Sequence, residues 1–374
     1  MIIGLLKDTL PERRVALLPT NVKHLVDRKT TILVETGAGA EAFADDSAYS
    51  EAGARVVQRN EVLEQANLLV QVAEPDVSLL DQLQPEQIWL SEYKPLWHIS
   101  LVKKFADLKL TSFSMDTIPR TTRAQAMDVL SSQATVAGYK AVLDAAIHLP
   151  SFFPMFMSAA GTIRPANVLV LGAGVAGLQA IAVARRMGAQ VAAFDVRSAV
   201  KEEVMSLGAR FVEVEGAKED DAAGGYAVEQ TEEYKKRQQE AINQHAAKAN
   251  VVICTAQIPG RKAPLLISKE VVADMQPGSV IIDLASSTGG NCELSEDNKT
   301  VVKHGVTIIG QSNYPTQMPK DASKMFGTNV SNFLELLIDD EGNLHLDFNN
   351  EIVRGTCITH QGEIYNERVK SVTA

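Results

Sequence analysis

Cysteine, positive charge and long apolar runs are all scarce in this chain of 374 residues. The three cysteines, Cys254, Cys292 and Cys357, lie far apart without CxxC spacing, which argues against a metal set or a disulfide framework and favours free thiols in a reducing compartment. Lys and Arg total 36 against 46 Asp and Glu, a net charge of −10. This acidic balance argues against a nucleic-acid partner and against electrostatic docking on anionic lipid.

Membrane and export signals are missing as well. The most apolar stretches, around 165–184 and 279–286, have the length of strands or buried helices, and no apolar run approaches the roughly 20 residues that span a bilayer. Charged residues at Lys7, Asp8 and Glu12 come too early for the apolar region of a signal peptide. We therefore expect a chain with no membrane segment of its own.

The remaining composition is that of an α/β protein with more than one core. Apolar residues make up 45% and charged residues 22%, and the length exceeds that of one ordinary domain. Strand-like segments alternate with helical patterns in two series, which is typical of parallel sheets. The first series is MIIGLL, TTILVET, NLLVQVAE, QIWLSEY and LTSFSMD, and the second is ANVLVLG, AQVAAFD, ARFVEVE, ANVVICT, SVIIDLA and VTIIGQ.

Two long helices are expected to join two Rossmann-like domains. A helix over 122–148, capped by Thr121 or Thr122, carries the chain out of the first domain, and a helix near 321–338 returns it. A cleft between two such domains is a usual ligand site. The predicted domains are residues 1–125 with 321–374, and residues 126–320.

A GxGxxG motif in NVLVLGAGVAGLQAIAVARRMGAQVAAFD predicts a dinucleotide site. Gly172 permits a tight turn, Gly174 lets the backbone approach a pyrophosphate, and Gly177 lets helix and strand pack closely. The following helix offers free N–H groups to the phosphates. Asp195 ends the next strand, where a carboxylate accepts hydrogen bonds from both ribose hydroxyls and repels a 2′-phosphate. This favours NAD(H) over NADP(H), although an Arg such as Arg197 can hold a 2′-phosphate.

Two later strand ends, CTAQIPG and DLASSTGGN, should line the same site because ligands bind beyond the carboxyl ends of parallel strands. The alternatives are a Gly-rich turn without a ligand and two ordinary tight loops. The residues predicted to bind the dinucleotide are Gly172, Gly174, Val175, Ala176, Gly177, Asp195, Val196, Arg197, Thr255, Ala256 and Gln257.

Five segments, in order along nearly the whole chain, carry a family resemblance. They are ERRVALLP, RAQAMDVLSSQATVAGYKAV, VLVLGAGVAGLQAIAVARRMGAQVAAFDVR, IPGRKAPLLI and GSVIIDLASSTGGNCE. Together they resemble the NAD(H)-binding component of proton-translocating NAD(P) transhydrogenase, and alanine dehydrogenase is the related family. The resemblance implies an NADP(H)-binding partner, a membrane component that couples transfer to proton translocation, a homodimer, and a cytoplasmic subunit peripheral to the inner membrane.

The resemblance also implies roles for polar residues outside the glycine motif. Arg120, Gln125, Asp128 and Ser131 would reach the nicotinamide and its ribose. From the residues alone, a polar seam of inter-domain hydrogen bonds explains them equally. The charged insertion at 215–240 reads as a solvated loop that leads into a helix, and the resemblance implies that its Tyr226 folds over bound nucleotide.

The chain departs from alanine dehydrogenase where that enzyme carries its acid/base groups. Ala73, Lys94 and Ser287 stand where the resemblance places a Lys, a His and an Asp, although the substrate-binding Arg persists as Arg14. Lys94 and His98 leave a different acid/base pair open.

We therefore expect a hydride-transfer component, because transfer between two nicotinamides requires proximity of the rings and no general acid or base. The chain has one good fingerprint, since ETGAGAEAF at 35–43 lacks the last glycine, so NADP(H) should bind to a partner. An amino-acid dehydrogenase and a non-catalytic NAD(H)-sensing module are the alternatives.

Overall fold

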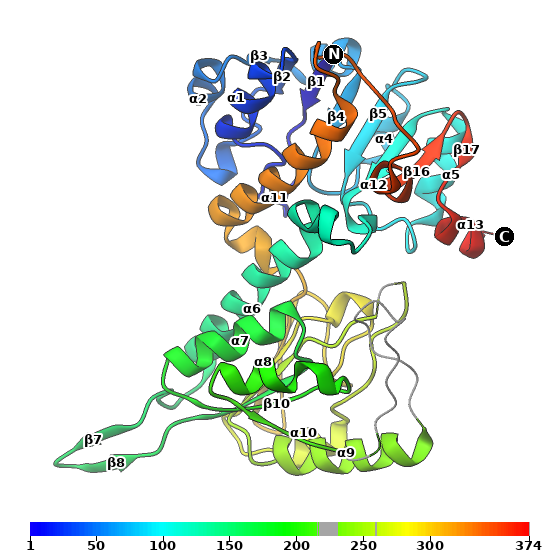
Figure 1. Ribbon diagram of the computed structural model, residues 1–374. Helices are drawn as coiled ribbons and strands as arrows, with labels where there is room; N and C mark the ends of the chain where they lie inside the picture. The colour runs from blue at the N-terminus through cyan, green and yellow to red at the C-terminus, as the bar shows by residue number, and fades with distance from the viewer. Residues whose placement is uncertain (215, 217–230, 259, 374) are drawn as a thin grey trace. The chain divides into compact units, whose positions relative to one another are not determined.

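The computed structural model describes residues 1–214, 216, 231–258 and 260–373 (Figure 1). The chain forms two compact units, of which unit 1 is Met1–Gln133 with Pro315–Ala374 and unit 2 is Ala134–Tyr314. The chain leaves unit 1 within helix α6, and it re-enters unit 1 just before helix α11. Tyr226 lies outside the described residues.

Unit 1 is built on an eight-stranded sheet over its described residues. Six parallel strands follow the order β3-β2-β1-β4-β5-β6, which is the 3-2-1-4-5-6 order of a dinucleotide-binding fold. Beyond β6, the antiparallel strands β16 and β17 form the edge. The strands are β1 (Ile2–Leu5), β2 (Thr31–Glu35), β3 (Arg55–Val57), β4 (Leu68–Val70), β5 (Ile88–Ser91), β6 (Thr111–Ser114), β16 (Cys357–His360) and β17 (Glu363–Ile364).

Side-chain alternation along these strands fills two separate cores. Ile32 and Val34 belong to the core that α1, α2, α11 and α12 cover, whereas Leu33 belongs to the core under α3, α5 and α13. Burial on both faces explains why the strands are apolar throughout. The helices are α1 (Pro19–Asp27), α2 (Asp46–Glu51), α3 (Arg59–Gln65), α4 (Val77–Leu80), α5 (Ile99–Asp107), α11 (Pro319–Leu334), α12 (Glu351–Thr356) and α13 (Glu367–Thr373).

Unit 2 repeats this plan with a seven-stranded sheet over its described residues, in the order β11-β10-β9-β12-β13-β15-β14. The first six strands in this order are parallel, and β14 is an antiparallel edge. A separate two-stranded hairpin, β7–β8, leaves this unit (Figure 1). The strands are β7 (Phe156–Ser158), β8 (Gly161–Ile163), β9 (Asn167–Leu171), β10 (Gln190–Phe194), β11 (Arg210–Phe211), β12 (Val251–Cys254), β13 (Val280–Asp283), β14 (Lys299–Lys303) and β15 (Val306–Gly310).

The sheet of unit 2 is also covered on both faces. Val168 and Val170 pack beneath α6, α7 and α8, and Leu169 and Leu171 pack beneath α9 and α10. The predicted α/β class with two Rossmann-like domains is therefore confirmed. The helices are α6 (Val129–His148), α7 (Val175–Arg186), α8 (Lys201–Ser206), α9 (Glu232–Ala246) and α10 (Lys269–Asp274).

The predicted long helix over 122–148 is wrong at its beginning. Residues Thr122–Met127 form a separate 3-10 helix, η3, and α6 begins at Val129. Asp128 between them has an extended backbone, with φ −75° and ψ 91°. Its carboxylate accepts a hydrogen bond from the N–H of Ser131 at 3.0 Å, so Asp128 is the residue that caps the α-helix.

The expectation of wholly parallel sheets is also incomplete. Strand β14 precedes β15 with only a tight turn between them, in which His304 (φ 52°) and Gly305 (φ 76°) are left-handed. A turn this short can join only antiparallel strands, because a parallel pair requires a long crossover.

Candidate functional site

The three glycines of the motif form a turn between β9 and α7. Gly172 has φ +98°, a conformation that side chains rarely adopt. A Cβ on Gly177 would lie 1.9 Å from the carbonyl oxygen of Gly172, so the close packing there requires glycine. A Cβ on Gly174 would meet nothing within 4 Å, which leaves open space at the start of α7. Each glycine thus has the geometry that its predicted role requires.

This turn lies at the point where the strand order of unit 2 reverses, because β9 and β12 are neighbours. The end of β12 is fixed to the turn: the Thr255 hydroxyl donates to the carbonyl oxygen of Gly172 at 2.8 Å. Gln257 donates through its amide to the Leu284 carbonyl oxygen at 2.9 Å. The predicted residues of the β9 and β12 ends are therefore brought together.

Sequence reasoning missed the residue that connects the later strand ends. The buried Asn291 side chain donates to the Ala256 carbonyl oxygen at 2.9 Å and accepts from the Ala256 N–H at 3.1 Å. It also donates to the carbonyl oxygen of Pro264 at 2.8 Å. The signal was present as the final Asn of DLASSTGGN, which was treated as one small-residue loop.

Asp195 lies at the end of β10 beside the glycine turn, and its side chain is only 7% exposed. One carboxylate oxygen accepts from the Ala173 N–H at 2.7 Å and from Arg197 Nη2 at 2.9 Å. The other accepts from the Arg197 N–H and from Arg197 Nε, each at 2.9 Å. These hydrogen bonds with Asp195 raise the pKa of the Arg197 guanidinium above its ordinary value.

The other predicted residues of this site lie on its two sides. Val175 is exposed in the first turn of α7, and Val196 follows Asp195 and packs against the core under α9 and α10. The Ala176 carbonyl oxygen is covered by α6, since a Cβ on Gly138 would lie 2.1 Å from it. Ala176 therefore fixes the packing of α7.

These features fit a dinucleotide. The open space at Gly174 lies at a helix N-terminus, where backbone N–H groups and the helix dipole favour phosphate. A buried carboxylate stands at the end of the neighbouring strand, where a ribose diol is expected. Across the described residues there is no cluster of His, Cys, Asp and Glu that could hold a metal ion.

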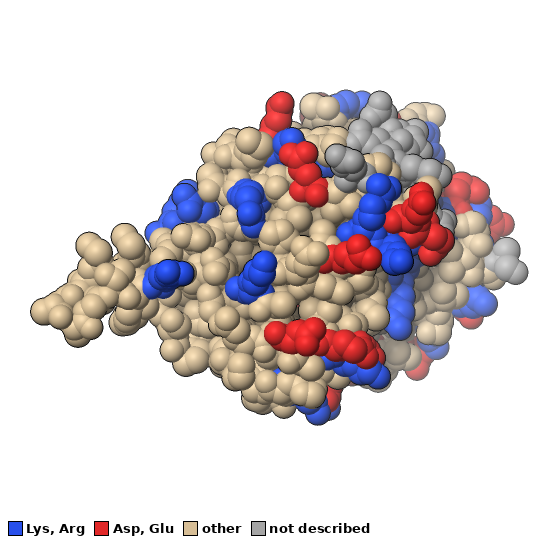
Figure 2. All heavy atoms as spheres, turned by 90° about the horizontal axis from the view of Figure 1, so that it is seen from below, with Lys and Arg blue, Asp and Glu red and all other residues tan. Residues whose placement is uncertain are grey.

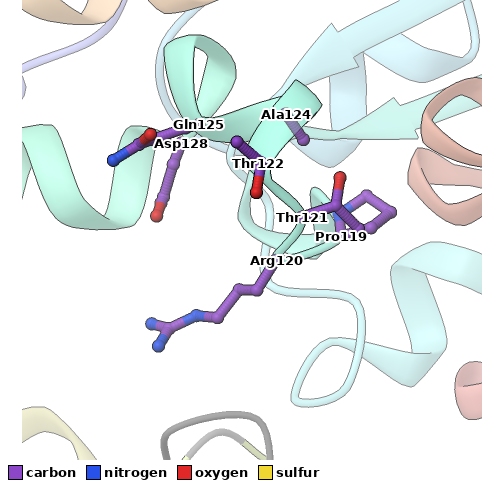
Figure 3. A pocket seen from close by; sticks show the side chains of 7 residues that line it. All are labelled: Pro119, Arg120, Thr121, Thr122, Ala124, Gln125 and Asp128. Carbon is purple, nitrogen blue, oxygen red and sulfur yellow. The ribbon is translucent and has the colours of Figure 1, made fainter.

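Unit 1 carries the second predicted group of polar residues. A hollow of about 280 Å³ lies beside η3 and the preceding loop. Figure 3 shows Gln125 and Asp128 next to each other at one end of it and Arg120 reaching out from the loop. The lining residues are Pro119, Arg120, Thr121, Thr122, Ala124, Gln125 and Asp128.

Asp128 and Ser131 are joined to each other at the edge of this hollow. The Ser131 hydroxyl donates to Asp128 Oδ2 at 2.6 Å, and the Ser131 N–H donates to Oδ1 at 3.0 Å. Both side chains thus help to start α6. Asp128 also lines the hollow, so a structural role and a contact with a ligand are compatible there.

Helix α11 holds η3 in place, a feature that sequence reasoning missed. The side-chain amides of Asn329 and Asn332 donate to the Ala126 carbonyl oxygen at 2.8 Å and 3.0 Å. Two amides spaced i, i+3 on one helix were the available signal. They fix the backbone between Gln125 and Asp128.

Arg14 is enclosed within unit 1. Its guanidinium makes two hydrogen bonds with the Glu12 carboxylate, at 2.9 Å and 2.8 Å, and both side chains are less than a tenth exposed. Nη1 donates to Gln133 Oε1 at 2.9 Å, and the guanidinium carbon lies 5.6 Å from the centre of the Phe326 ring. This pairing neutralises the Arg that would bind a substrate carboxylate in an amino-acid dehydrogenase.

The strand-order reversal of unit 1 is occupied by a side chain. Asp8, which follows β1, accepts from the N–H groups of Val72 and Ala73 beyond β4, at 3.0 Å and 2.9 Å. Burial raises the pKa of Asp8 to about 7. ETGAGAEAF follows β2, away from this point. Unit 1 therefore lacks the glycine turn of unit 2 among its described residues.

The candidate acid/base residues of an amino-acid dehydrogenase also have other surroundings. His98 Nδ1 lies 2.5 Å from Glu74 Oε2, and the Lys94 backbone is left-handed with φ 48°. Ser287 is an exposed residue of a 3-10 turn after β13.

The surface and the helices agree with two expected absences. Figure 2 shows acidic and basic side chains intermixed, with large uncharged areas, on the face that it displays. Among the helices of the described residues, none combines the length and the apolarity required to cross a bilayer.

Both halves of the chain match one family. Residues 4–137 match the model for the alanine dehydrogenase/PNT N-terminal domain, and residues 141–367 match the model for the corresponding C-terminal domain. A chain of the NAD(P) transhydrogenase subunit alpha from Rhodospirillum rubrum is 45% identical and is aligned over 97% of each chain. The NAD(P) transhydrogenase subunit alpha of Haemophilus influenzae is 40% identical over 97% of this chain and 71% of its own length.

Solved structures agree with these matches. A transhydrogenase from Sinorhizobium meliloti superposes with a TM-score of 0.89 at 40% identity, covering 97% of this chain and 100% of that one. An L-alanine dehydrogenase superposes with a TM-score of 0.81 at 22% identity, covering 100% of this chain and 99% of that one, which shows a shared fold. Unit 2 is accordingly an NAD-binding dehydrogenase-like domain, and the chain belongs to the alanine dehydrogenase/PNT family and, within it, to the NAD(P) transhydrogenase alpha subunits.

Proposed function

We propose that this chain binds NAD(H) on unit 2 and exchanges hydride with NADP(H) bound on a partner subunit, in a complex whose membrane subunit couples the transfer to proton translocation. The glycine turn beside Asp195 carries this proposal, because it occurs in unit 2 at the switch point of the sheet. In unit 1 the equivalent point is filled by Asp8. The second nucleotide is therefore assigned to the partner.

When bound, NADH supplies the hydride, and the residues of the chain hold and orient it. The backbone at Gly174, Val175 and Ala176 would hold the pyrophosphate, and Asp195 with Val196 and Arg197 would surround the adenosine ribose. Thr255, Ala256 and Gln257 would support the nicotinamide side through backbone approach. We assign Tyr226 the role of covering the bound nucleotide.

Arg120, Gln125, Asp128 and Ser131 are proposed to contact the nicotinamide and its ribose. Support comes from the hollow that the first three line and from the bonds between Asp128 and Ser131, which hold a carboxylate at its edge. Hydride transfer between two nicotinamides requires orientation, and amide and guanidinium groups on a fixed 3-10 turn can provide it.

A homodimer, peripheral on the cytoplasmic face of the inner membrane, belongs to the proposal. Its support is the β7–β8 hairpin, which projects at the left of Figure 2 without charged residues. Met157 is 68% exposed, and the exposed rings of Phe152 and Phe156 stack with centroids 5.3 Å apart. Exposed apolar surface of this kind marks an interaction site, and a second copy of the chain is the proposed occupant.

The binding claim is tested by titrating the isolated protein with NADH and NADPH. We expect NADH to bind more tightly than NADPH, and Asp195→Ala to weaken NADH binding sharply. Equal or tighter binding of NADPH by the wild-type protein would overturn the assignment.

The amino-acid dehydrogenase alternative is tested by adding alanine and NAD⁺ to the isolated protein. The Arg14–Glu12 pair and the absence of a Lys at Ala73 predict no alanine-dependent NADH formation at neutral or alkaline pH. Detectable NADH formation would favour the dehydrogenase instead.

A further inference from the structure

The Asp195 carboxylate has no vacant acceptor position. A carboxylate offers about four lone-pair positions. In Asp195 these take the Ala173 N–H, the Arg197 N–H, Arg197 Nε and Arg197 Nη2, all at 2.7–2.9 Å. A ribose diol that donates to Asp195 must therefore replace two of these donors.

The two backbone donors cannot leave without breaking the site. The Ala173 N–H belongs to the glycine turn, which the Thr255 hydroxyl and the Gly177 packing hold in place. The Arg197 N–H is two residues from Asp195 in the same loop. The two donors on the Arg197 side chain sit at the end of a flexible stem that is 28% exposed, so they can move away by rotation.

We infer that the Arg197 guanidinium occupies the ribose positions of Asp195 and must swing away when NAD(H) binds, so that Arg197 acts as an internal competitor that sets nucleotide affinity. This inference rests on the proposed NAD(H) site. It assigns Arg197 a role opposite to that of a simple binding residue: its removal should strengthen binding.

The size of the effect follows from the pair. A partly exposed ion pair contributes at most about 1 kcal/mol, and the two charge-assisted hydrogen bonds place this pair at or above that limit. Removal of the guanidinium should therefore tighten nucleotide binding by about 3- to 10-fold.

Titration of four proteins with NADH tests the inference. These are the wild-type protein, Arg197→Ala, Arg197→Lys and the control Arg186→Ala, which removes the same charge from an exposed residue in the last turn of α7. We expect tighter binding for Arg197→Ala and a smaller gain for Arg197→Lys, since Lys cannot form the two-pronged contact. Arg186→Ala should stay within about twofold of the wild type.

A second pair of probes locates the effect at the ribose. ADP carries the adenosine ribose and a pyrophosphate, and 2′,3′-dideoxy-ADP lacks both hydroxyls. Arg197→Ala should bind ADP more tightly than the wild type does but should bind dideoxy-ADP with unchanged affinity. Thermal unfolding of each free variant shows that it is folded, and Arg197→Lys retains the charge should the Ala variant unfold.

The outcomes separate the two proposals. NADH binding that is unchanged or weaker in Arg197→Ala, or an equal gain with dideoxy-ADP, overturns the competitor role while leaving the NAD(H) site intact. No NADH binding by the wild type or any variant overturns the proposed function and this inference with it.

Discussion

The contrast between Gly174 and Gly177 gives the sharpest structural test of the nucleotide site. Both are glycines of one motif, yet the space around them differs. A Cβ at Gly177 would lie 1.9 Å from a backbone carbonyl oxygen, far inside the ~3.5 Å of an ordinary contact, whereas a Cβ at Gly174 would meet nothing within 4 Å. Alanine substitutions at the two positions should therefore fail for different reasons.

Gly177→Ala should destabilise unit 2. The obstacle is backbone, so the turn and α7 must separate, and overpacking of this kind costs about 3 kcal/mol or more. For a unit of this size the loss corresponds to a fall in Tm of roughly 6–12 °C. Gly174→Ala should change stability by less than about 0.5 kcal/mol. The poorer N-cap is offset by the lower entropy of the unfolded chain, and φ −77° suits alanine.

Nucleotide binding should show the reverse contrast. The new methyl group of Gly174→Ala projects into the space assigned to the pyrophosphate, so NADH affinity should fall at least about 10-fold in a well-folded protein. Thermal unfolding of the free proteins and NADH titration measure the two effects. The reasoning is refuted if Gly174→Ala binds NADH like the wild type, or if Gly177→Ala unfolds at the wild-type temperature.

Three further predictions follow from unit 1. Asp128→Ala should lower the free energy of unfolding by about 1 kcal/mol through loss of the α6 cap, whereas Asp128→Asn keeps an acceptor and most of that stability; equal losses in chemical denaturation would contradict the capping role. The pKa of Asp8 is raised from 3.8 to about 7, so the folded state holds a proton that the unfolded state releases, and stability should fall as pH rises from about 4 to 7. Asp8→Asn should flatten this fall in Tm measured across the range, and an unchanged slope would contradict the assignment. Gln125→Asn shortens the amide by one methylene, so in the reconstituted complex it should reduce the transfer rate by on the order of 100-fold with a modest change in NADH affinity; affinity that falls in step with rate would make Gln125 a binding residue.

The elements of the fold with strong local signals were predictable from the sequence. The GxGxxG turn, its preceding strand and Asp195 follow from residue types that each perform one steric or electrostatic task. The buried strands were recognisable because both faces of each sheet are covered, which makes the strands continuously apolar. Short connections were the weak point: β14, β16 and the hairpin β7–β8 have few residues and little periodicity.

The errors in the site arose where tertiary contacts override local pattern. The apolar run before α6 looked helical throughout, yet the Asp128 cap starts the α-helix at Val129, and two Asn side chains of distant α11 hold the 3-10 turn. The Asp195–Arg197 pair was likewise visible only in space. The sequence suggested Arg197 as a 2′-phosphate ligand, whereas the structure shows that it occupies the carboxylate.

Hydride transfer in the presence of an NADP(H)-binding partner tests the central claim most directly. The isolated chain, the isolated partner and their mixture would be given NADH and an oxidised NADP⁺ analogue with a distinct absorbance, and reduction of the analogue would be followed. The account predicts transfer in the mixture alone, and its loss when the chain carries Gly174→Ala. Absence of transfer in the mixture, with NADH binding intact, would contradict the catalytic role and favour a nucleotide-sensing module.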